Sequence, residues 1–450
     1  MGRRTLQTLL GGVLVLSALA VGAKEIPEVR PDREGFSAER LQRITDFMEA
    51  RVADETMVGG MGLIARNGRI VYSQSYGMAD REVGREMTDD AIHRIYSMTK
   101  PITGVALMML YEEAKFFLND PIAMYLPEFA NLKVARSTAD GNVGIVSDGT
   151  QSMTIGEGEK NLEGELRVPT RQPTVRDLLT HTAGMTYGIF GNTEVDKIYR
   201  DAGLLDPRLT LAEFTEKLGK LPLQYDPGTR WHYSVSVDVQ GRLVEALSGM
   251  SFGEFLQKRL FEPLDMKDTR FFFDPATKDR VAQIYAPKGV VWPNFMQPPT
   301  GPGLDPADPQ VDAGYQPGAK FEGGGGGLVS TARDYLRFAQ MMLNGGELDG
   351  VRILSPKTVE LITSNHIGDK KLGFGREGIG FGLGFAVVAD PGAAGEIGSV
   401  GEYNWGGAAG TRFWIDPDEN LIGIFMVQSI PHRTRLADQF KSLVYQSLVE

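Results

Sequence analysis

Strand-like segments lie at both ends of this chain, and this arrangement restricts the folds that it can adopt. Near the N-terminus, residues 61–65 and 69–76 flank Asn67-Gly68, a dipeptide typical of a tight hairpin turn. Near the C-terminus, residues 410–415 and 421–428 form a second pair of strand-like runs. The sequence therefore predicts an α+β fold, in which helices flank one antiparallel sheet built from both termini.

Helical patterns occupy much of the remaining chain. Residues 38–54 and about 435–448 have the apolar spacing of amphipathic helices, and the middle, roughly 105–365, is mostly helical. Long inserted loops interrupt this middle part at about 131–168 and 286–327, and the second loop is rich in proline and glycine. Loops of this length are usually functional or disordered, so we expect a helical region that carries two extended insertions.

The N-terminal segment has the pattern of a secretory signal. Arg3 and Arg4 form a short basic region, and residues 9–23 form an apolar run that is short for a membrane span. Small residues stand at the possible cleavage positions in both Ala18-Leu19-Ala20 and Val21-Gly22-Ala23. We therefore predict that residues 1–23 are a signal peptide, and that the mature chain is secreted across the inner membrane into the periplasm.

Composition excludes several classes of function. The formal net charge of -11, without a basic cluster, argues against a nucleic-acid partner. The absence of cysteine excludes thiol catalysis, thiolate metal sites and disulfides. The five histidines do not have the spacing of metal ligands, so we expect no metal and no other cofactor. With 450 residues and 42% apolar content, the chain can form one large domain or two ordinary ones.

A candidate nucleophile is Ser97, which precedes Lys100 by three residues at the start of an apolar helical segment. This spacing places both side chains on one helix face. A lysine amine that is desolvated and neutral can take the proton of a serine hydroxyl, and the helix N-terminus favours an oxyanion. The pattern Ser97-x-x-Lys100 therefore indicates nucleophilic catalysis, with an ordinary helix start as the simpler explanation.

Two further segments carry candidate residues. Tyr233 follows the turn at Pro227-Gly228-Thr229 and precedes an apolar helix, so its phenol can act as a general base or acid. The segment Trp405-Gly406-Gly407-Ala408 precedes a strand, and its glycines allow the backbone to approach a ligand closely. A structural tyrosine and a glycine-rich turn are the alternative interpretations.

A competing motif is Gly249-Met250-Ser251-Phe252-Gly253, which matches the nucleophile elbow of α/β-hydrolases. That elbow requires a strand before the serine, whereas residues 237–247 have helical periodicity. Ser251 and Glu254 instead fit a capping box that opens a helix over residues 252–260. We therefore expect Ser251 to be structural.

The three candidate segments occur in the order used by serine β-lactamases and penicillin-binding proteins, which the chain resembles. The surrounding segments resemble the class C β-lactamase-like branch in particular. These segments are Thr174–Met185, Gly325–Tyr335 and Gly380–Phe385. The resemblance covers about residues 35–445.

The resemblance implies a β-lactamase-like fold and one serine hydrolase domain over residues 24–450. In this reading, an α/β subregion comprises about 35–104 and 370–450, and a mainly helical subregion comprises about 105–369.

Two departures from the family pattern bear on the substrate. Val235 stands where most relatives have an asparagine, and Trp405 stands where they have a lysine or histidine. Both changes remove polar recognition of a carboxylated amide, and the pattern is similar to that of family VIII carboxylesterases. The resemblance implies that Ser97 is the nucleophile and that Lys100 and Tyr233 are the base and acid. It also implies an oxyanion hole and a substrate-binding group. The oxyanion hole comprises the backbone N–H groups of Ser97 and Ala408. The substrate-binding group comprises Trp405, Gly406, Gly407 and Val235.

We therefore predict a serine carboxylesterase that hydrolyses short to medium acyl esters of small molecules. The alternatives are a β-lactamase or D-Ala-D-Ala carboxypeptidase with the same nucleophile, and a non-catalytic binding protein. Neither a nucleic acid nor a stable membrane span is expected. The sequence makes no prediction of the oligomeric state.

Overall fold

The computed structural model describes residues 24–135, 166–291, 297–373 and 376–450. The predicted signal peptide, residues 1–23, lies outside the described residues. Residues 136–165, most of the first predicted loop, also lie outside them.

The predicted N-terminal hairpin is confirmed. Strands β1 (Gly59–Arg66) and β2 (Arg69–Asp80) pair antiparallel, and Arg66 lies opposite Arg69 across the turn. The turn residues Asn67 and Gly68 have φ values of 53° and 73°. A two-residue turn with positive φ at both positions matches the twist of paired strands, which explains the strong signal of this dipeptide.

The hairpin belongs to an antiparallel sheet that contains eight strands among the described residues. The sheet joins both ends of the chain, as predicted, because β1 pairs antiparallel with β16. Its order is β12 (Ile379–Phe381), β13 (Ala386–Val388), β14 (Tyr403–Gly406), β15 (Arg412–Asp416), β16 (Leu421–Val427), β1, β2 and β3 (Arg85–Glu86). Strands β12, β13 and β14 were not predicted, and β15 begins at Arg412 rather than Gly410.

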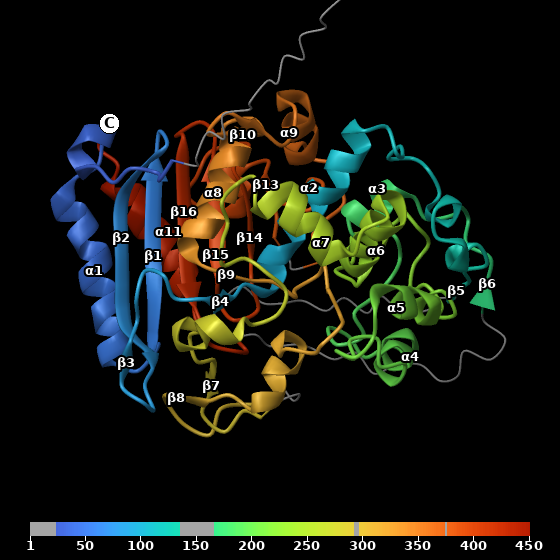
Figure 1. Cartoon of the computed structure of the whole chain (residues 1–450), viewed down its shortest axis with the longest axis horizontal. Helices are drawn as coiled ribbons and strands as arrows, with labels where there is room; N and C mark the ends of the chain where they lie inside the picture. The colour runs from blue at the N-terminus through green and yellow to red at the C-terminus, as the bar shows by residue number, and fades with distance from the viewer. Residues whose placement is uncertain (1–23, 136–165, 292–296, 374–375) are drawn as a thin grey trace, which may run out of the picture.

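Helices flank this sheet and form a separate group beside it (Figure 1). The two predicted terminal helices are α1 and α11, within one or two residues of the expected ends. The α-helices are α1 (Ala38–Ala53), α2 (Thr99–Glu112), α3 (Val175–Leu179), α4 (Glu194–Asp201), α5 (Leu211–Leu218), α6 (Ser236–Ser248), α7 (Phe252–Leu256), α8 (Ala332–Leu343), α9 (Pro356–Thr363), α10 (Pro391–Ala394) and α11 (Leu436–Ser447).

The two faces of the sheet bury different cores. Side chains alternate along β1, so that Ile64 packs with α1 and α11 while Leu63 belongs to the larger core on the other face. In this larger core Tyr335 of α8 packs against Phe413 of β15, with ring centroids 4.9 Å apart. The larger core continues into the helical region, where α2 packs against α6. The sheet and the helical region therefore share one apolar interior.

Shorter elements connect these layers. Within the second predicted loop, β7 (Tyr285–Pro287) pairs with β8 (Leu304–Pro306), and a 3₁₀ helix covers Pro309–Tyr315. The helix predicted over 252–260 begins as α7 and continues as a π-helix over Gln257–Phe261. None of the described helices is long and apolar enough to cross a membrane.

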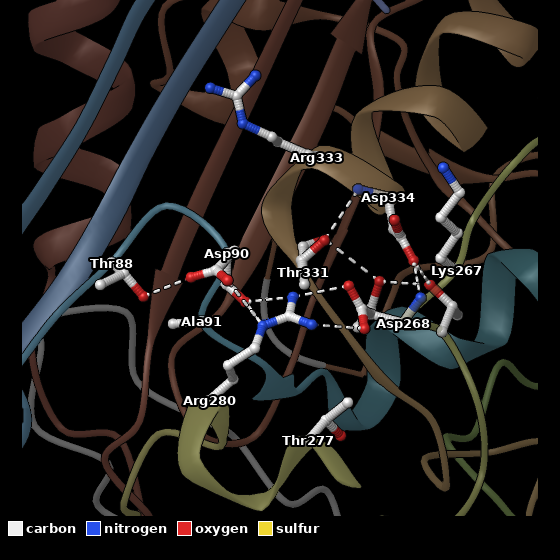
Figure 2. A network of polar contacts seen from close by, with 12 residues as sticks. Thr88, Asp90, Ala91, Lys267, Asp268, Thr277, Arg280, Thr331, Arg333 and Asp334 are labelled. Carbon is white, nitrogen blue, oxygen red and sulfur yellow. Dashed lines mark hydrogen bonds and ion pairs between the residues drawn. The ribbon is translucent and has the colours of Figure 1, made fainter. Parts of the chain in front are cut away.

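A polar network fixes the segments that lead toward the candidate site (Figure 2). Arg280 pairs with Asp90 at 2.8 Å and with Asp268 at 2.7 Å. The carboxylate of Asp334, in α8, accepts the N–H of Asp268 and the hydroxyl of Thr269, both at 2.8 Å. Nearby, β4 (His93–Arg94) pairs with β9 (Val329–Ser330). These contacts hold the segment that precedes Ser97 against the segment that follows the glycine run Gly323–Gly327.

Candidate active site

Ser97 lies in a 3₁₀ turn, Tyr96–Met98, that leads directly into the buried helix α2. The predicted position at the start of this helix is therefore correct, although the first turn has 3₁₀ rather than α geometry. Tyr96 has a φ of 41°, a strained value for a residue with a Cβ atom. The ring of Tyr96 packs edge-on against Tyr315, with centroids 5.8 Å apart. This packing helps to hold the strained turn and the half-buried serine that follows it.

The Lys100 side chain contacts the Ser97 side chain, as the spacing of three residues predicts. Its Nζ atom is 3.1 Å from Ser97 Oγ and 2.5 Å from the carbonyl oxygen of Gly325. The side chain is only 1% exposed, and this burial lowers the pKa of Lys100 to about 7, while Asp238 acts in the opposite direction. The structure therefore provides a lysine amine that can be neutral close to physiological pH.

Tyr233 lies just before the N-terminus of α6 and contacts the same Ser97 hydroxyl. Its O–H donates to Ser97 Oγ at 2.7 Å, and Lys100 Nζ lies 4.5 Å from the centroid of its ring. Burial raises the pKa of Tyr233 well above its ordinary value of 10, against smaller opposing effects of hydrogen bonds with Ser97 and Trp405. The phenol is therefore protonated at neutral pH and suited to donate a proton.

Aromatic rings surround Tyr233. His181, Tyr187 and Phe190 lie with ring centroids 4.9, 5.3 and 5.7 Å from it. His181 has a φ of 54°, and its Nδ1 atom accepts the backbone N–H of Ser234 at 3.3 Å. The sequence does not mark these three residues as site residues, although His181 lies in a segment that resembles the family. These rings meet Tyr233 only through packing between segments that are distant in the sequence, and no local sequence pattern reveals such packing.

The segment Trp405-Gly406-Gly407-Ala408 lies partly within the sheet. Trp405 and Gly406 end strand β14, so the alternative interpretation as a glycine-rich turn applies only to the next residues, which form the turn into β15. The cause is the pairing of Trp405 with Phe413 and of Gly406 with Arg412 across the strands.

This turn lies against the segment that precedes Ser97. A Cβ atom on Gly407 would lie 2.5 Å from the carbonyl oxygen of Ile95, so only glycine allows this approach. Ala408 follows at an exposed position. Trp405 is 9% exposed, and its ring lies 5.7 Å from that of Tyr233. The structure thus brings the third predicted segment next to the first two.

Val235 has a different environment from the other predicted site residues. It precedes α6 and is fully buried among the apolar side chains of the main core. Its proposed contact with a substrate stays a prediction.

The competing nucleophile Ser251 lies at the start of α7, after helix α6 rather than after a strand. Its hydroxyl accepts the N–H of Glu254 at 3.2 Å, as an N-cap does. The reciprocal half of the predicted capping box is absent from the described contacts, because the Glu254 carboxylate pairs with Lys258 at 2.6 Å. Ser251 therefore caps a helix and lacks the setting of a nucleophile elbow.

The family model described as Beta-lactamase matches residues 44–444. The chain belongs to the beta-lactamase family. The family resemblance inferred from the three motif segments is thereby confirmed. Among the residues that the structure describes, no group of three or more histidine, aspartate or glutamate side chains could hold a metal ion.

Similar proteins extend this family assignment. Protein Rv1367c of Mycobacterium tuberculosis is 30% identical over 391 residues, covering 83% of this chain and 86% of the relative. Esterase EstB of Burkholderia gladioli is 28% identical, covering 84% and 88%. The solved structure of EstCE1, a hydrolase with promiscuous acyltransferase activity, has a TM-score of 0.69 at 24% identity and covers 91% and 98%. The predicted β-lactamase-like fold is confirmed, and this beta-lactamase family member is a serine hydrolase.

Proposed function

We propose that this chain is a serine carboxylesterase that hydrolyses short to medium acyl esters through an acyl-enzyme on Ser97. The observation that carries the proposal is the convergence of two side chains on one hydroxyl. Lys100 Nζ lies 3.1 Å from Ser97 Oγ, and the Tyr233 hydroxyl lies 2.7 Å from it. A serine hydroxyl needs a neighbouring base to become an effective nucleophile, and this site offers an amine and a phenol within reach.

In the acylation step, Ser97 Oγ attacks the carbonyl carbon of the ester, and its proton passes to the neutral amine of Lys100. The carbonyl oxygen becomes an oxyanion, for which the backbone N–H groups of Ser97 and Ala408 are the proposed donors. The bond to the alcohol oxygen then breaks. Tyr233 gives its proton to that oxygen and regains one from the Lys100 ammonium, so the alcohol leaves neutral.

In the deacylation step, water attacks the acyl carbon and gives a proton to the same pair of residues. The bond between the acyl group and Ser97 Oγ breaks, and the serine oxygen takes that proton back. The net reaction consumes one ester and one water and produces one acid and one alcohol. No other reactant is required.

Trp405 supports an uncharged ester rather than a carboxylated amide as the substrate. An indole offers apolar area and one N–H donor but no positive charge. A substrate carboxylate placed against it would lose water without gaining a cation, which costs about 1–3 kcal/mol or more for a buried unpaired group. EstB, an esterase by name, is consistent with this reading. A β-lactamase or D-Ala-D-Ala carboxypeptidase is the second candidate, because the same nucleophile serves amide substrates.

A non-catalytic binding protein would not require Lys100, Tyr233 and Ser97 to meet. The lysine is buried at a cost in solvation, because the protonated amine loses water and its closest hydrogen-bond partner among the described residues is the neutral carbonyl of Gly325. A catalytic role accounts for that arrangement, whereas a binding role leaves it unexplained.

The test compares kcat/KM for p-nitrophenyl esters of increasing acyl length, for nitrocefin and for a D-Ala-D-Ala peptide. We expect the best ester to exceed both other substrates by orders of magnitude. Ser97→Ala should lower ester turnover by at least about 10³-fold. Ser251→Ala is the matched control, which removes a hydroxyl outside the site and should leave turnover intact. A nitrocefin value equal to the best ester value would contradict the esterase proposal and favour the second candidate.

A further inference from the structure

A buried carboxylate lies behind the candidate catalytic lysine. Asp238 is on α6, five residues after Tyr233, and is 2% exposed. Its Oδ1 atom accepts the backbone N–H of Gly325 at 2.9 Å. Its Oδ2 atom is buried and has no hydrogen-bond partner among the described residues. A buried carboxylate with an unsatisfied oxygen is costly, so this arrangement calls for a functional explanation.

Gly325 connects this carboxylate to the lysine. Its N–H donates to Asp238, and its carbonyl oxygen accepts a hydrogen bond from Lys100 Nζ at 2.5 Å. A Cβ atom at Gly325 would lie 2.5 Å from the Tyr187 hydroxyl and 3.0 Å from Asp238 Oδ2, so the close packing requires glycine. Asp238 therefore fixes Gly325 through its N–H group, and the carbonyl group of Gly325 in turn holds the Lys100 amine.

The titratable groups around Asp238 come from three segments. Lys100 faces it from α2, Tyr187 from the segment after α3, and Tyr233 from the residues before α6. Burial raises the pKa of Asp238, while the Gly325 N–H and the charge of Lys100 act to lower it. In return, the carboxylate favours the protonated form of Lys100 and so opposes the effect of burial on the lysine pKa.

We propose that Asp238 is a positioning residue, which aims the Lys100 amine at Ser97 through the Gly325 peptide and places a negative charge behind that amine. It contacts neither of the reacting atoms and acts through the glycine peptide and through its charge. This inference rests on the proposed role of Lys100 as the base and is independent of the substrate that the enzyme prefers.

The test uses two substitutions that separate geometry from charge. Asp238→Asn keeps the size of the side chain and an oxygen that can accept the Gly325 N–H, but removes the charge. Without that charge the lysine pKa falls further, so the rise of kcat/KM with pH should move to lower pH by at least half a unit. Asp238→Ala also removes the acceptor, and a displaced base of this kind should lower kcat by about 10²-fold with little change in KM.

Asp334→Asn provides the matched control. Asp334 is also buried and also accepts a backbone N–H, but among the described residues it hydrogen-bonds with Asp268, Thr269 and Thr331, in the polar network of Figure 2, and not with Lys100 or Gly325. This substitution should change thermal stability and leave both the pH profile and kcat as they are. If Asp238→Ala does not fold, the profile of Asp238→Asn decides. An unchanged pH profile in folded Asp238→Asn would overturn the proposal.

A second readout separates this inference from the choice of substrate. A p-nitrophenyl alkylphosphonate reacts with an activated serine and releases p-nitrophenol, so its rate reports Lys100 even if no carboxylic ester proves to be a good substrate. The pH dependence of this labelling should shift in Asp238→Asn in the same direction. A shift in labelling together with poor ester turnover would support the role of Asp238 and reject the esterase proposal alone.

Discussion

At the scale of single residues, burial has opposite consequences for the two groups that contact Ser97. It lowers the pKa of Lys100 and raises that of Tyr233, because in both cases it disfavours the charged form. The amine is thus a proton acceptor and the phenol a proton donor over the same range of pH. One physical cause therefore supports the proposed roles of base for Lys100 and acid for Tyr233, which the sequence left open between these residues.

This assignment predicts a pH profile. The lysine must be neutral to act as the base, so kcat/KM should rise as the pH increases through about 7. Lys100→Ala and Tyr233→Phe should each lower kcat by about 10²–10⁴-fold, with modest changes in KM, because general acid–base groups act in the transition state. The double variant should lose much less than the product of the two effects, since both residues handle one proton.

Steady-state kinetics between pH 5 and 9 provide the measurement. Full kcat in Tyr233→Phe would make the tyrosine structural and leave Lys100 as the sole base. A rising limb that persists unchanged in Lys100→Ala would mean that another group titrates there.

A second prediction at this scale concerns Trp405. Trp405→Lys places a cation next to the ring of Tyr233, where a substrate carboxylate could pair with it. The ratio of kcat/KM between p-nitrophenyl butyrate and nitrocefin should then fall by about tenfold or more, a change of about 1.4 kcal/mol. Trp405→Phe is the uncharged control and should keep the preference for the ester. A ratio that moves equally in both variants would assign the effect to lost packing rather than to charge.

The sequence predicted the residues that local motifs mark and missed those that distant segments assemble. Ser97, Lys100 and Tyr233 stand at recognisable positions, and the structure brings them together. Asp238 lies in a largely apolar helical segment. A single acidic residue in such a segment is a weak indication of a functional role. The role of Gly325 depends on contacts with two helices far away in the sequence, and no spacing rule contains that information.

At the scale of elements, reactive groups stand at the ends of well-packed segments. Ser97 precedes α2 and Tyr233 precedes α6, and these two helices pack against each other. Ala408 follows β14 in a turn whose Gly407 N–H donates to the Thr411 carbonyl at 2.7 Å. Apolar helix and strand bodies therefore position groups that are themselves partly accessible.

The missed elements share a physical reason. Strands β12, β13 and β14 have only three or four residues each, too few for an alternating pattern to emerge. Long strands such as β1 and β16 have such patterns and were predicted. The short strands are stabilised by backbone hydrogen bonds with their neighbours in the sheet, and this pairing depends on the tertiary structure.

Packing of α11 on the sheet yields a prediction about stability. A Cβ atom at Gly62 in β1 would lie 2.7 Å from the ring of Phe440 in α11. Gly62→Ala should therefore destabilise the protein by about 1–3 kcal/mol through overpacking. Gly314→Ala is the control, because no heavy atom lies within 4 Å of its added Cβ.

Urea unfolding followed by circular dichroism measures both variants. The Gly62→Ala midpoint should be clearly lower, and turnover per folded molecule should be unchanged because Gly62 faces α11. Equal midpoints for the two variants would show that the helix adjusts without cost.

At the scale of the whole molecule, the sheet that joins the chain ends also joins the parts of the site. Ser97 follows the N-terminal hairpin, Tyr233 comes from the helical region, and Trp405 lies in the C-terminal part of the sheet. The network around Arg280 and Asp334 connects the segment that precedes β4 with residues 268–280 and with the start of α8 (Figure 2). Unfolding of either region would therefore separate the proposed nucleophile from its partners.

Export stays a prediction from the N-terminal segment. Removal of residues 1–23 would take away Arg3 and Arg4 and change the formal net charge from -11 to -13. A more acidic chain would keep the expectation that nucleic acids are not its partners.

Labelling by a phosphonate tests whether Ser97 is the residue that carries the acyl group. The purified chain is incubated with a p-nitrophenyl alkylphosphonate, p-nitrophenol release is measured, and the adduct is mapped by peptide mass spectrometry. We predict release of one p-nitrophenol per chain, loss of ester turnover in parallel, and a single adduct on the peptide that contains Ser97. An adduct on Ser251, or full ester turnover in a chain whose Ser97 is completely labelled, would show that Ser97 is not the nucleophile.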